Sequence, residues 1–171
     1  MYDLLTPVIN SVSELIHKEC KIKLHLIGDG ITKDKMMEFV KKNKLSDHII
    51  FLGSMSNQKV SNIINDFHCL LYPMFKNICP SAIAIKILEG VMKGKVIITT
   101  NSGNNSSLFY ENKDLILESN TNEEIIDKLE KVLKNYDYYK EIAEKNSIKH
   151  RKMRSFEHYR VELMKLITKL N

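Results

Sequence analysis

Pro80-Ser-Ala-Ile-Ala-Ile-Lys-Ile-Leu-Glu-Gly-Val-Met-Lys-Gly-Lys-Val-Ile-Ile-Thr-Thr100 is a mostly apolar stretch with a single carboxylate, that of Glu89. At about 100° per residue, its apolar side chains cover one broad half of a helical wheel, while Glu89 and Lys86 lie on the other half. An amphipathic helix over residues 81–93 is therefore predicted. The β-branched run that follows, residues 96–99, predicts a buried strand.

Glu89 has two interpretations at this point. Glu89 and Lys93 are four residues apart, so they can form a surface ion pair worth about a few tenths of a kcal/mol. Charged side chains are mostly solvated, which favours this interpretation when the helix is taken alone. The other interpretation is that the carboxylate belongs to a functional site. The helix alone does not distinguish the two interpretations, so the rest of the sequence is needed.

Helical and strand patterns alternate along the chain, which indicates βαβ units and a parallel, doubly wound sheet with helices on both faces. We therefore predict one α/β, Rossmann-like domain over residues 1–171, with residues 136–171 as its C-terminal helical extension. This architecture normally opens with a strand, whereas the chain opens with a helix, so we expect a strand to precede it. The remaining predicted helices cover residues 4–16, 33–44, 57–66 and 122–171, and the remaining strands cover 22–27, 49–52, 68–72 and 115–117.

The composition is that of a globular protein. With 171 residues, 43% hydrophobic and 27% charged, the chain can form one domain with a real core and is too apolar for a disordered segment. No run of 18 apolar residues and no signal-peptide pattern occurs. Cys20, Cys69 and Cys79 are odd in number and far apart, which is typical of reduced thiols. These features predict a cytoplasmic protein.

The net charge is +5, and basic residues are concentrated late in the chain. Such a cluster could contact anionic lipid or nucleic acid. A solvated helix face is favoured instead, because Glu141 and Glu144 are interspersed among the basic residues. Without an aromatic RNA-binding motif or zinc-finger spacing we predict no nucleic-acid partner, while peripheral contact with the inner face of the membrane stays open. The basic residues are Lys140, Lys145, Lys149, His150, Arg151, Lys152 and Arg154.

Several nucleotide-binding and catalytic motifs are missing or incomplete. Gly28 and Gly30 follow a predicted strand, but Lys33 stands where a dinucleotide motif has its third glycine. Gly53 and Ser54 occupy the place after the second strand where a ribose-binding acid would be expected, which disfavours a nicotinamide enzyme. No P-loop and no H-x-x-x-H pair occurs. We therefore predict neither a metal nor a bound cofactor.

Ligands of a parallel sheet bind beyond the carboxyl ends of its strands. The helix that contains Glu89 starts at this edge, so its first amides, around residues 82–85, would form a natural cradle for phosphate. The loops expected at the same edge are residues 28–32, 53–57, 73–81, 100–105 and 118–121.

Four short motifs follow one another in the chain: Leu26-Ile-Gly-Asp-Gly30, Ile49-Ile-Phe-Leu-Gly53, Leu71-Tyr-Pro73 and Ile87-Leu-Glu-Gly-Val-Met-Lys-Gly-Lys-Val-Ile-Ile-Thr-Thr100. Their order and spacing resemble the C-terminal domain of GT-B glycosyltransferases, and most closely the retaining group called glycosyltransferase family 4. The similarity extends over residues 4–133. The Ser102-Gly-Asn-Asn105 loop and the Arg154-Ser-Phe156 segment before a last helix fit the same family.

The resemblance implies a role for Glu89. The donor site of this family contains two glutamates eight positions apart, and the second, which Glu89 matches, binds the ribose hydroxyls of the nucleotide sugar. The first falls on Ser81, which is not an acid, and the usual Gly-rich turn reads Ala82-Ile83-Ala84. Backbone amides at Ala82, Ile83, Ala84 and Ile85 would hold the diphosphate without a metal, and Gly28, Gly53, Ser54 and Met55 would complete the nucleotide-sugar site.

The resemblance also implies an activity, the transfer of a sugar from a nucleoside diphosphate to a glycan or lipid-linked acceptor. The family has an Arg–Lys pair after the first strand of this domain, and no such pair precedes the first helix, so we expect a fragment that lacks the acceptor-binding N-terminal domain and is inactive alone. Because Ser81 replaces an acid, a degenerate GT-B domain that serves as a binding or assembly module is the alternative. Another doubly wound nucleotide binder, such as an epimerase relative, is a third interpretation.

Overall fold

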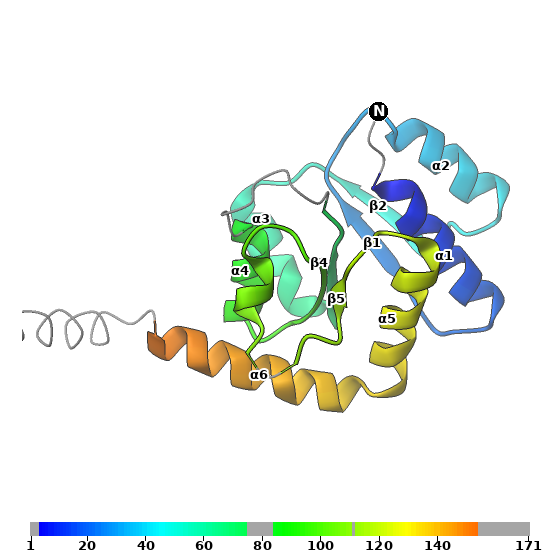
Figure 1. Ribbon diagram of the computed structural model, residues 1–171. Coiled ribbons are helices and arrows are strands. Elements are labelled where there is room, and N and C mark those ends of the chain that lie inside the picture. The colour runs from blue at the N-terminus through cyan, green and yellow to red at the C-terminus, as the bar shows by residue number, and fades with distance from the viewer. Residues whose placement is uncertain (1–3, 75–83, 111, 154–171) are drawn as a thin grey trace, which may run out of the picture.

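The computed structural model describes residues 4–74, 84–110 and 112–153, in which helices and strands alternate as predicted (Figure 1). The strands are β1 (Leu24–Ile27), β2 (Ile49–Gly53), β3 (Cys69–Tyr72), β4 (Val96–Thr100) and β5 (Ile116–Leu117). The helices are α1 (Leu5–His17), α2 (Lys33–Lys42), α3 (Asn57–Ile63), α4 (Ile85–Met92), α5 (Asn122–Lys134) and α6 (Tyr136–Met153), with short 3₁₀ turns η1 (Ile64–Asp66) and η2 (Asn105–Leu108).

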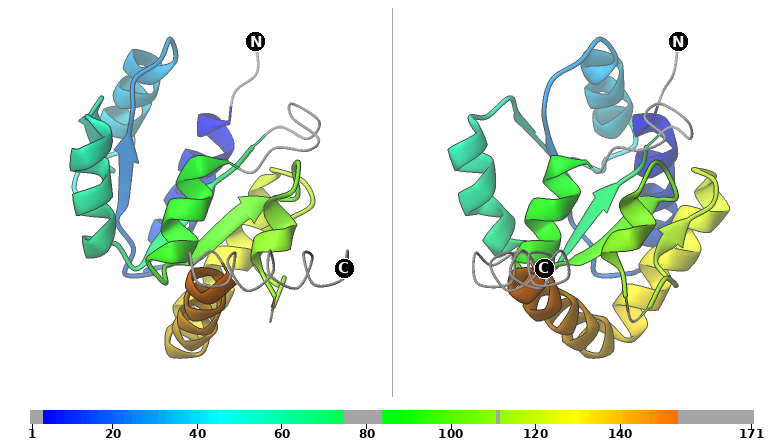
Figure 2. Two further views of the ribbon diagram at one scale, coloured as in Figure 1. Left: turned by 90° about the vertical axis from the view of Figure 1, so that its left-hand side faces the viewer. Right: turned by 60° about the vertical axis from the view of Figure 1, so that its left-hand side comes forward.

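All strand pairs are parallel, which confirms the predicted α/β class, but the strands form two sheets and not one. One sheet is β1–β2 and the other is β3–β4–β5. Within the described residues no hydrogen-bonded ladder joins β1 to β3, and Figure 2 (left) shows these two strands set apart. In the described residues, the predicted parallel sheet is therefore divided into a two-stranded and a three-stranded part.

Helices cover both faces of the sheets, as a doubly wound fold requires. Figure 1 shows α1, α2 and α5 on one side of the strands and α3 and α4 on the other. Side chains alternate between the two: Leu71 and Ile98 pack with the first group of helices, whereas Leu70 and Ile97 pack with the second. We call these the α1 face and the α4 face. The buried core of the α4 face consists of Ile64, Leu70, Ile87, Val91, Ile97 and Leu108.

Between residues 122 and 153, which the structure describes, the predicted helical pattern is interrupted at Asn135. Asn135, with φ −136° and ψ 42°, ends α5, and α6 continues as a separate helix to Met153. Ser147 of α6 donates a hydrogen bond to the Met92 carbonyl at 2.7 Å, and the Nε2 atom of buried His150 donates to the Leu108 carbonyl at 2.9 Å. His150, predicted to belong to a solvated cluster, is thus part of the contact that fixes α6 against α4 and η2.

Side-chain hydrogen bonds of Thr121 and Glu124 hold the start of α5 and the residues just before it. The Thr121 hydroxyl accepts a hydrogen bond from the Glu124 amide at 3.4 Å, while the Glu124 carboxylate accepts from the amides of Glu118 and Ser119, both at 2.6 Å. Burial raises the pKa of Glu124, but the hydrogen bonds from Ser119 and from the two amides outweigh it, so the pKa lies below its ordinary value of 4.5. The ionised carboxylate therefore stabilises this end of the sheet.

We expect Glu124→Ala to lower the free energy of unfolding at pH 7 by about 1–2 kcal/mol, because two amides lose a charged acceptor. A depressed pKa in the folded state means that this stabilisation is present above the unfolded pKa and is lost as the pH falls through the folded pKa. The difference from wild type in urea unfolding should therefore shrink below about pH 4.5. Glu123→Ala, in the same first turn but exposed, is the control, and an equal loss for both variants would contradict the cap.

Candidate functional site

Two glycine turns meet at the carboxyl ends of β1 and β2. The Gly28 amide donates a hydrogen bond to the Gly53 carbonyl at 2.9 Å, and both residues have positive φ, 131° and 69°, which favours glycine. A Cβ atom at either position would meet no heavy atom within 4 Å among the described residues. Ser54 follows as an exposed residue and Met55 as a half-buried one. The structure thus brings Gly28, Gly53 and the two residues after Gly53 to one open edge, as predicted.

The start of α4 differs from the prediction. The helix begins at Ile85, with Ala84 at the N-cap position, whereas the predicted helix began at residue 81. Ser81, Ala82 and Ile83 lie outside the described residues. The amide of Ala84 donates to the side-chain oxygen of Asn105 at 3.2 Å, so one of the expected phosphate-binding amides already has an acceptor. The side chain of Ile85 is 78% exposed, which places this first turn at the surface.

A polar network anchors the chain where it leaves β3. The buried Thr100 hydroxyl accepts a hydrogen bond from the Met74 amide at 2.9 Å and donates to the Asn120 side-chain oxygen at 2.6 Å. The Asn120 side-chain nitrogen in turn donates to the Met74 carbonyl at 2.8 Å. Both Met74 and Ala84 are therefore tied to β4 and the loops that follow it. The loops that contain Asn105 and Asn120 were expected at this edge, but the contacts of these two side chains were not predicted.

Glu89 lies in the middle of α4, and its charge acts on Tyr72 at the end of β3. Its carboxylate is 3.3 Å from the Lys86 ammonium, and its side chain is 22% exposed. Hydrogen bonds from the Ser61 hydroxyl of α3 and from Lys86 hold the pKa of Glu89 below its ordinary value, despite partial burial that raises it. Burial, followed by the Glu89 charge, raises the pKa of Tyr72, the last residue of β3. Glu89 is thus an ionised, partly exposed acid on α4, with hydrogen-bond partners on α3 and α4.

The contacts of Lys93 disfavour the interpretation of Glu89 and Lys93 as a surface ion pair. The Lys93 ammonium donates to the Ser61 carbonyl at 2.8 Å and to the Asn65 side-chain oxygen at 3.4 Å, so Lys93 ties α4 to α3. The nearer partner of Glu89 is Lys86, one helical turn earlier. The carboxylate therefore belongs to a polar cluster between two helices, which is more constrained than a solvated i,i+4 pair.

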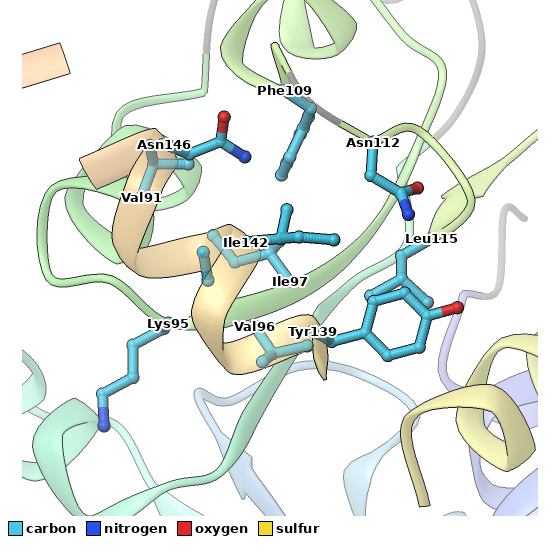
Figure 3. Close-up of a pocket in the computed structure, with 11 residues that line it drawn as sticks. Val91, Lys95, Val96, Ile97, Phe109, Asn112, Leu115, Tyr139, Ile142 and Asn146 are labelled. Carbon is cyan, nitrogen blue, oxygen red and sulfur yellow. The ribbon is translucent and has the colours of Figure 1, made fainter. Parts of the chain in front are cut away.

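A small surface hollow, of about 30 Å³, lies between α4, β4 and α6 (Figure 3). Lys95 and Val96 place it at the amino end of β4, opposite to the edge where Gly28, Gly53 and Glu89 are found. Its lining is mainly apolar and includes several buried residues of α4, β4 and α6, so it is a gap in the packing beneath α6. The lining residues are Val91, Lys95, Val96, Ile97, Phe109, Asn112, Leu115, Tyr139, Ile142, Ala143 and Asn146.

The described part of the basic cluster on α6 has partners within the chain. Lys145 pairs with Glu141 at 2.7 Å, the Lys149 ammonium lies 4.1 Å from the centre of the Tyr110 ring, and Arg151 donates to the Ser147 hydroxyl. These contacts favour the interpretation of a solvated helix face. Arg154 lies outside the described residues.

Two negative findings apply to residues 4–74, 84–110 and 112–153. No group of three or more His, Cys, Asp or Glu side chains has the arrangement needed to hold a metal ion. No helix there combines the length and the apolar composition that crossing a bilayer demands. Metal-independent binding stays a prediction.

Comparison with known proteins identifies the family. CapJ of Staphylococcus aureus is 28% identical over 100 residues, which are 57% of this chain and 24% of CapJ. HepE of Anabaena, solved in complex with UDP, superposes with a TM-score of 0.71 at 12% identity over 96% of this chain and 45% of HepE. The catalytic domain of the cholesterol-α-glucosyltransferase of Helicobacter pylori superposes with a TM-score of 0.66 at 20% identity, over 84% of this chain and 86% of that domain.

These structural similarities establish that the fold is the Rossmann-like domain found in GT-B glycosyltransferases. The chain spans less than half the length of CapJ and of HepE. The family model described as "Glycosyl transferases group 1" matches residues 5–149, which is most of the chain. This chain therefore belongs to the glycosyl transferases group 1 family.

Proposed function

We propose that this chain is the nucleotide-sugar-binding half of a retaining glycosyltransferase, which moves a sugar from a nucleoside diphosphate to a glycan or lipid-linked acceptor. The observation that carries the proposal is Glu89, an ionised, partly exposed carboxylate on α4 whose charge acts on Tyr72, the last residue of β3. The resemblance to the family implies that this position binds ribose. The complexes of HepE with UDP and UDP-glucose support a uridine nucleotide as the donor type.

The ribose and the diphosphate would be bound by different parts of α4. An ionised carboxylate at Glu89 can accept two charge-assisted hydrogen bonds from a vicinal diol. The amides of Ile87 and Leu88 already donate to the Ala84 carbonyl, at 3.0 and 3.1 Å, and the amide of Ala84 donates to Asn105. Of the described residues in this turn, Ile85 and Lys86 therefore provide the helix N-terminal amides for an anion. The positive end of the helix supplies the rest of the attraction without a metal.

Catalysis in this proposal is mainly electrostatic. As the glycosidic bond to the diphosphate breaks, negative charge grows on the leaving phosphate, and fixed amides and the helix dipole stabilise that charge. The acceptor would be held by a second, facing domain of the whole enzyme. Ser81 in place of the family's first glutamate is the observation that favours the alternative, a GT-B domain that binds a nucleotide sugar without transferring it.

We expect Glu89→Gln to weaken nucleotide binding by about 1–3 kcal/mol, or roughly 5- to 150-fold in Kd, because the ribose hydroxyls lose a charged acceptor. Calorimetric titration of the wild type and the variant with UDP, GDP, ADP and their sugars measures this and also identifies the base. The free energy of unfolding should change little, since the side chain is partly exposed.

Glu141→Gln is the matched control, because it makes the same substitution in an exposed ion pair on α6. It should leave the affinity for every nucleotide unchanged. Equal affinities of wild type and Glu89→Gln, for a nucleotide that does bind, would show that Glu89 is a structural residue between α3 and α4 and not a ribose ligand.

A further inference from the structure

The start of α4 has no capping side chain of its own. Ala84 is the N-cap residue, a position where alanine is disfavoured because it has no side-chain acceptor. Ser56 of α3 and Thr121 of α5 occupy the same position, and each accepts a hydrogen bond from an amide of the first helical turn. Within the described residues, α4 therefore begins without the side-chain cap that holds the start of the other two helices.

Asn105 holds this end of α4 from outside the helix. Its side-chain oxygen accepts from the Ala84 amide at 3.2 Å, and its side-chain nitrogen donates to the Met74 sulfur at 3.3 Å. Asn105 is only 1% exposed, and a buried amide costs free energy unless its hydrogen bonds are made. The turn that carries it is fixed as well, because Leu108 of η2 and Ile87 of α4 belong to one buried core.

This arrangement fixes the start of the helix without using the amides of its first turn. A capping hydroxyl or carboxylate accepts from the second or third amide of a helix, and so occupies a group that could otherwise bind an anion. Asn105 accepts instead from the amide of Ala84, which precedes the helix. The amides of Ile85 and Lys86, which the proposed function assigns to phosphate, are therefore not used by the side chain that positions them.

We infer that Asn105 is a positioning residue of the nucleotide site, which fixes the N-cap of α4 so that the Ile85 and Lys86 amides are in place before the phosphates bind. The inference rests on the proposed function, because it assigns these amides to a nucleoside diphosphate. Groups that are already held in their binding geometry lose less conformational freedom on binding, which increases affinity. Glu89, the proposed ribose ligand, lies about one turn further along α4, so the binding of a nucleoside without phosphates should depend much less on Asn105.

Two measurements on Asn105→Ala test the inference. The probes are the one of UDP, GDP and ADP that binds the wild type most tightly, and its nucleoside. The variant should raise the Kd of the diphosphate about tenfold by calorimetry and change that of the nucleoside by less than about twofold by NMR titration. Without any nucleotide, the amides of Ala84, Ile87 and Leu88 should exchange with deuterium faster than in the wild type, because the last two donate to the Ala84 carbonyl.

Asn146→Ala is the matched control. Asn146 of α6 is 3% exposed, and its side-chain oxygen accepts from the Tyr110 amide at 3.1 Å, so the substitution removes the same kind of hydrogen bond beside the hollow in Figure 3. Both variants should lower the midpoint of urea unfolding, but Asn146→Ala should leave the Kd of the diphosphate unchanged. If Asn105→Ala does not fold, Asn105→Leu removes the same acceptor with a side chain of similar volume and should give the same changes in Kd.

An unchanged Kd of the diphosphate in a folded Asn105 variant would overturn the inference and leave the proposed function in place, provided that Glu89→Gln still weakens binding. Equal losses for the diphosphate and the nucleoside would also overturn it, because Asn105 would then support the domain as a whole and not the phosphate-binding turn. A wild type that binds none of UDP, GDP and ADP would overturn the proposed function, and this inference with it.

Discussion

The 171-residue chain, incubated with nucleoside diphosphate sugars and glycan or lipid-linked acceptors, should transfer no measurable sugar. Under the proposed function, the reaction centre lies between this domain and a facing domain that holds the acceptor. Holding two reactants in the right geometry can contribute about 7–11 kcal/mol to lowering a barrier, equivalent to effective concentrations of about 10⁵–10⁸ M. Without the facing domain that contribution is lost, even where the donor still binds.

The measurement is a sugar-transfer assay of this chain beside the full-length protein, at equal concentrations and with the same donors. Turnover by the full-length protein alone is the expected result. Comparable turnover by the 171-residue chain would mean that the active site is complete within this domain. Nucleotide binding with no turnover by either protein would favour the non-catalytic module.

Ile98→Ala should lower the free energy of unfolding by about 2–5 kcal/mol. Ile98 is 0% exposed, lies in the middle of β4, and packs into the core of the α1 face. Removing three carbon atoms from a strand that is covered on both faces loses apolar burial and leaves a cavity that the surrounding helices can fill only in part. Since a domain of this kind is stable by only about 5–15 kcal/mol, the loss should be a large fraction of the total.

Urea unfolding of the wild type and the variant, followed by circular dichroism, measures this loss. Ile148→Ala is the matched control, because Ile148 is 66% exposed on α6 and the same atoms are removed. The control should change the free energy of unfolding by less than about 0.5 kcal/mol. Similar losses for the two variants would contradict the position of β4 at the centre of the core.

The alternation of helices and strands could be predicted because it depends on local periodicity. The apolar run at residues 96–99 corresponds to β4, all of whose residues are buried. Helix ends were less accurate: α2 stops at Lys42, because the chain turns through Lys44 with φ 57°, a conformation that nothing in the local pattern indicates. The separation of the sheet into two parts could not be predicted either, since it depends on which strands lie next to β1 and β3.

The candidate site, too, could be predicted where it depends on local sequence and not where it depends on tertiary contacts. Gly28 and Gly53 could be placed together, because turns after parallel strands meet at one edge of a sheet. Asn105 and Asn120 could not be found, because their partners Ala84 and Met74 are 21 and 46 residues away in the sequence. A single asparagine has no periodic pattern, so only the tertiary structure reveals the hydrogen-bond partners of its side-chain amide.

The core of the α4 face is smaller than that of the α1 face, which affects how easily each face opens locally. The α4 face has a small core, and α3 contributes no buried residue to it, whereas the α1 face is built from many more buried side chains among the described residues. Segments with few buried contacts open locally at a lower free energy than the whole domain. The layer formed by the helices of the α4 face, α3 and α4, contains Ser61 and Glu89. This layer should therefore open locally at a lower free energy than the α1 face. A nucleotide that binds only the closed layer, at about 100 times its Kd, would add about 2.7 kcal/mol to the stability of that layer.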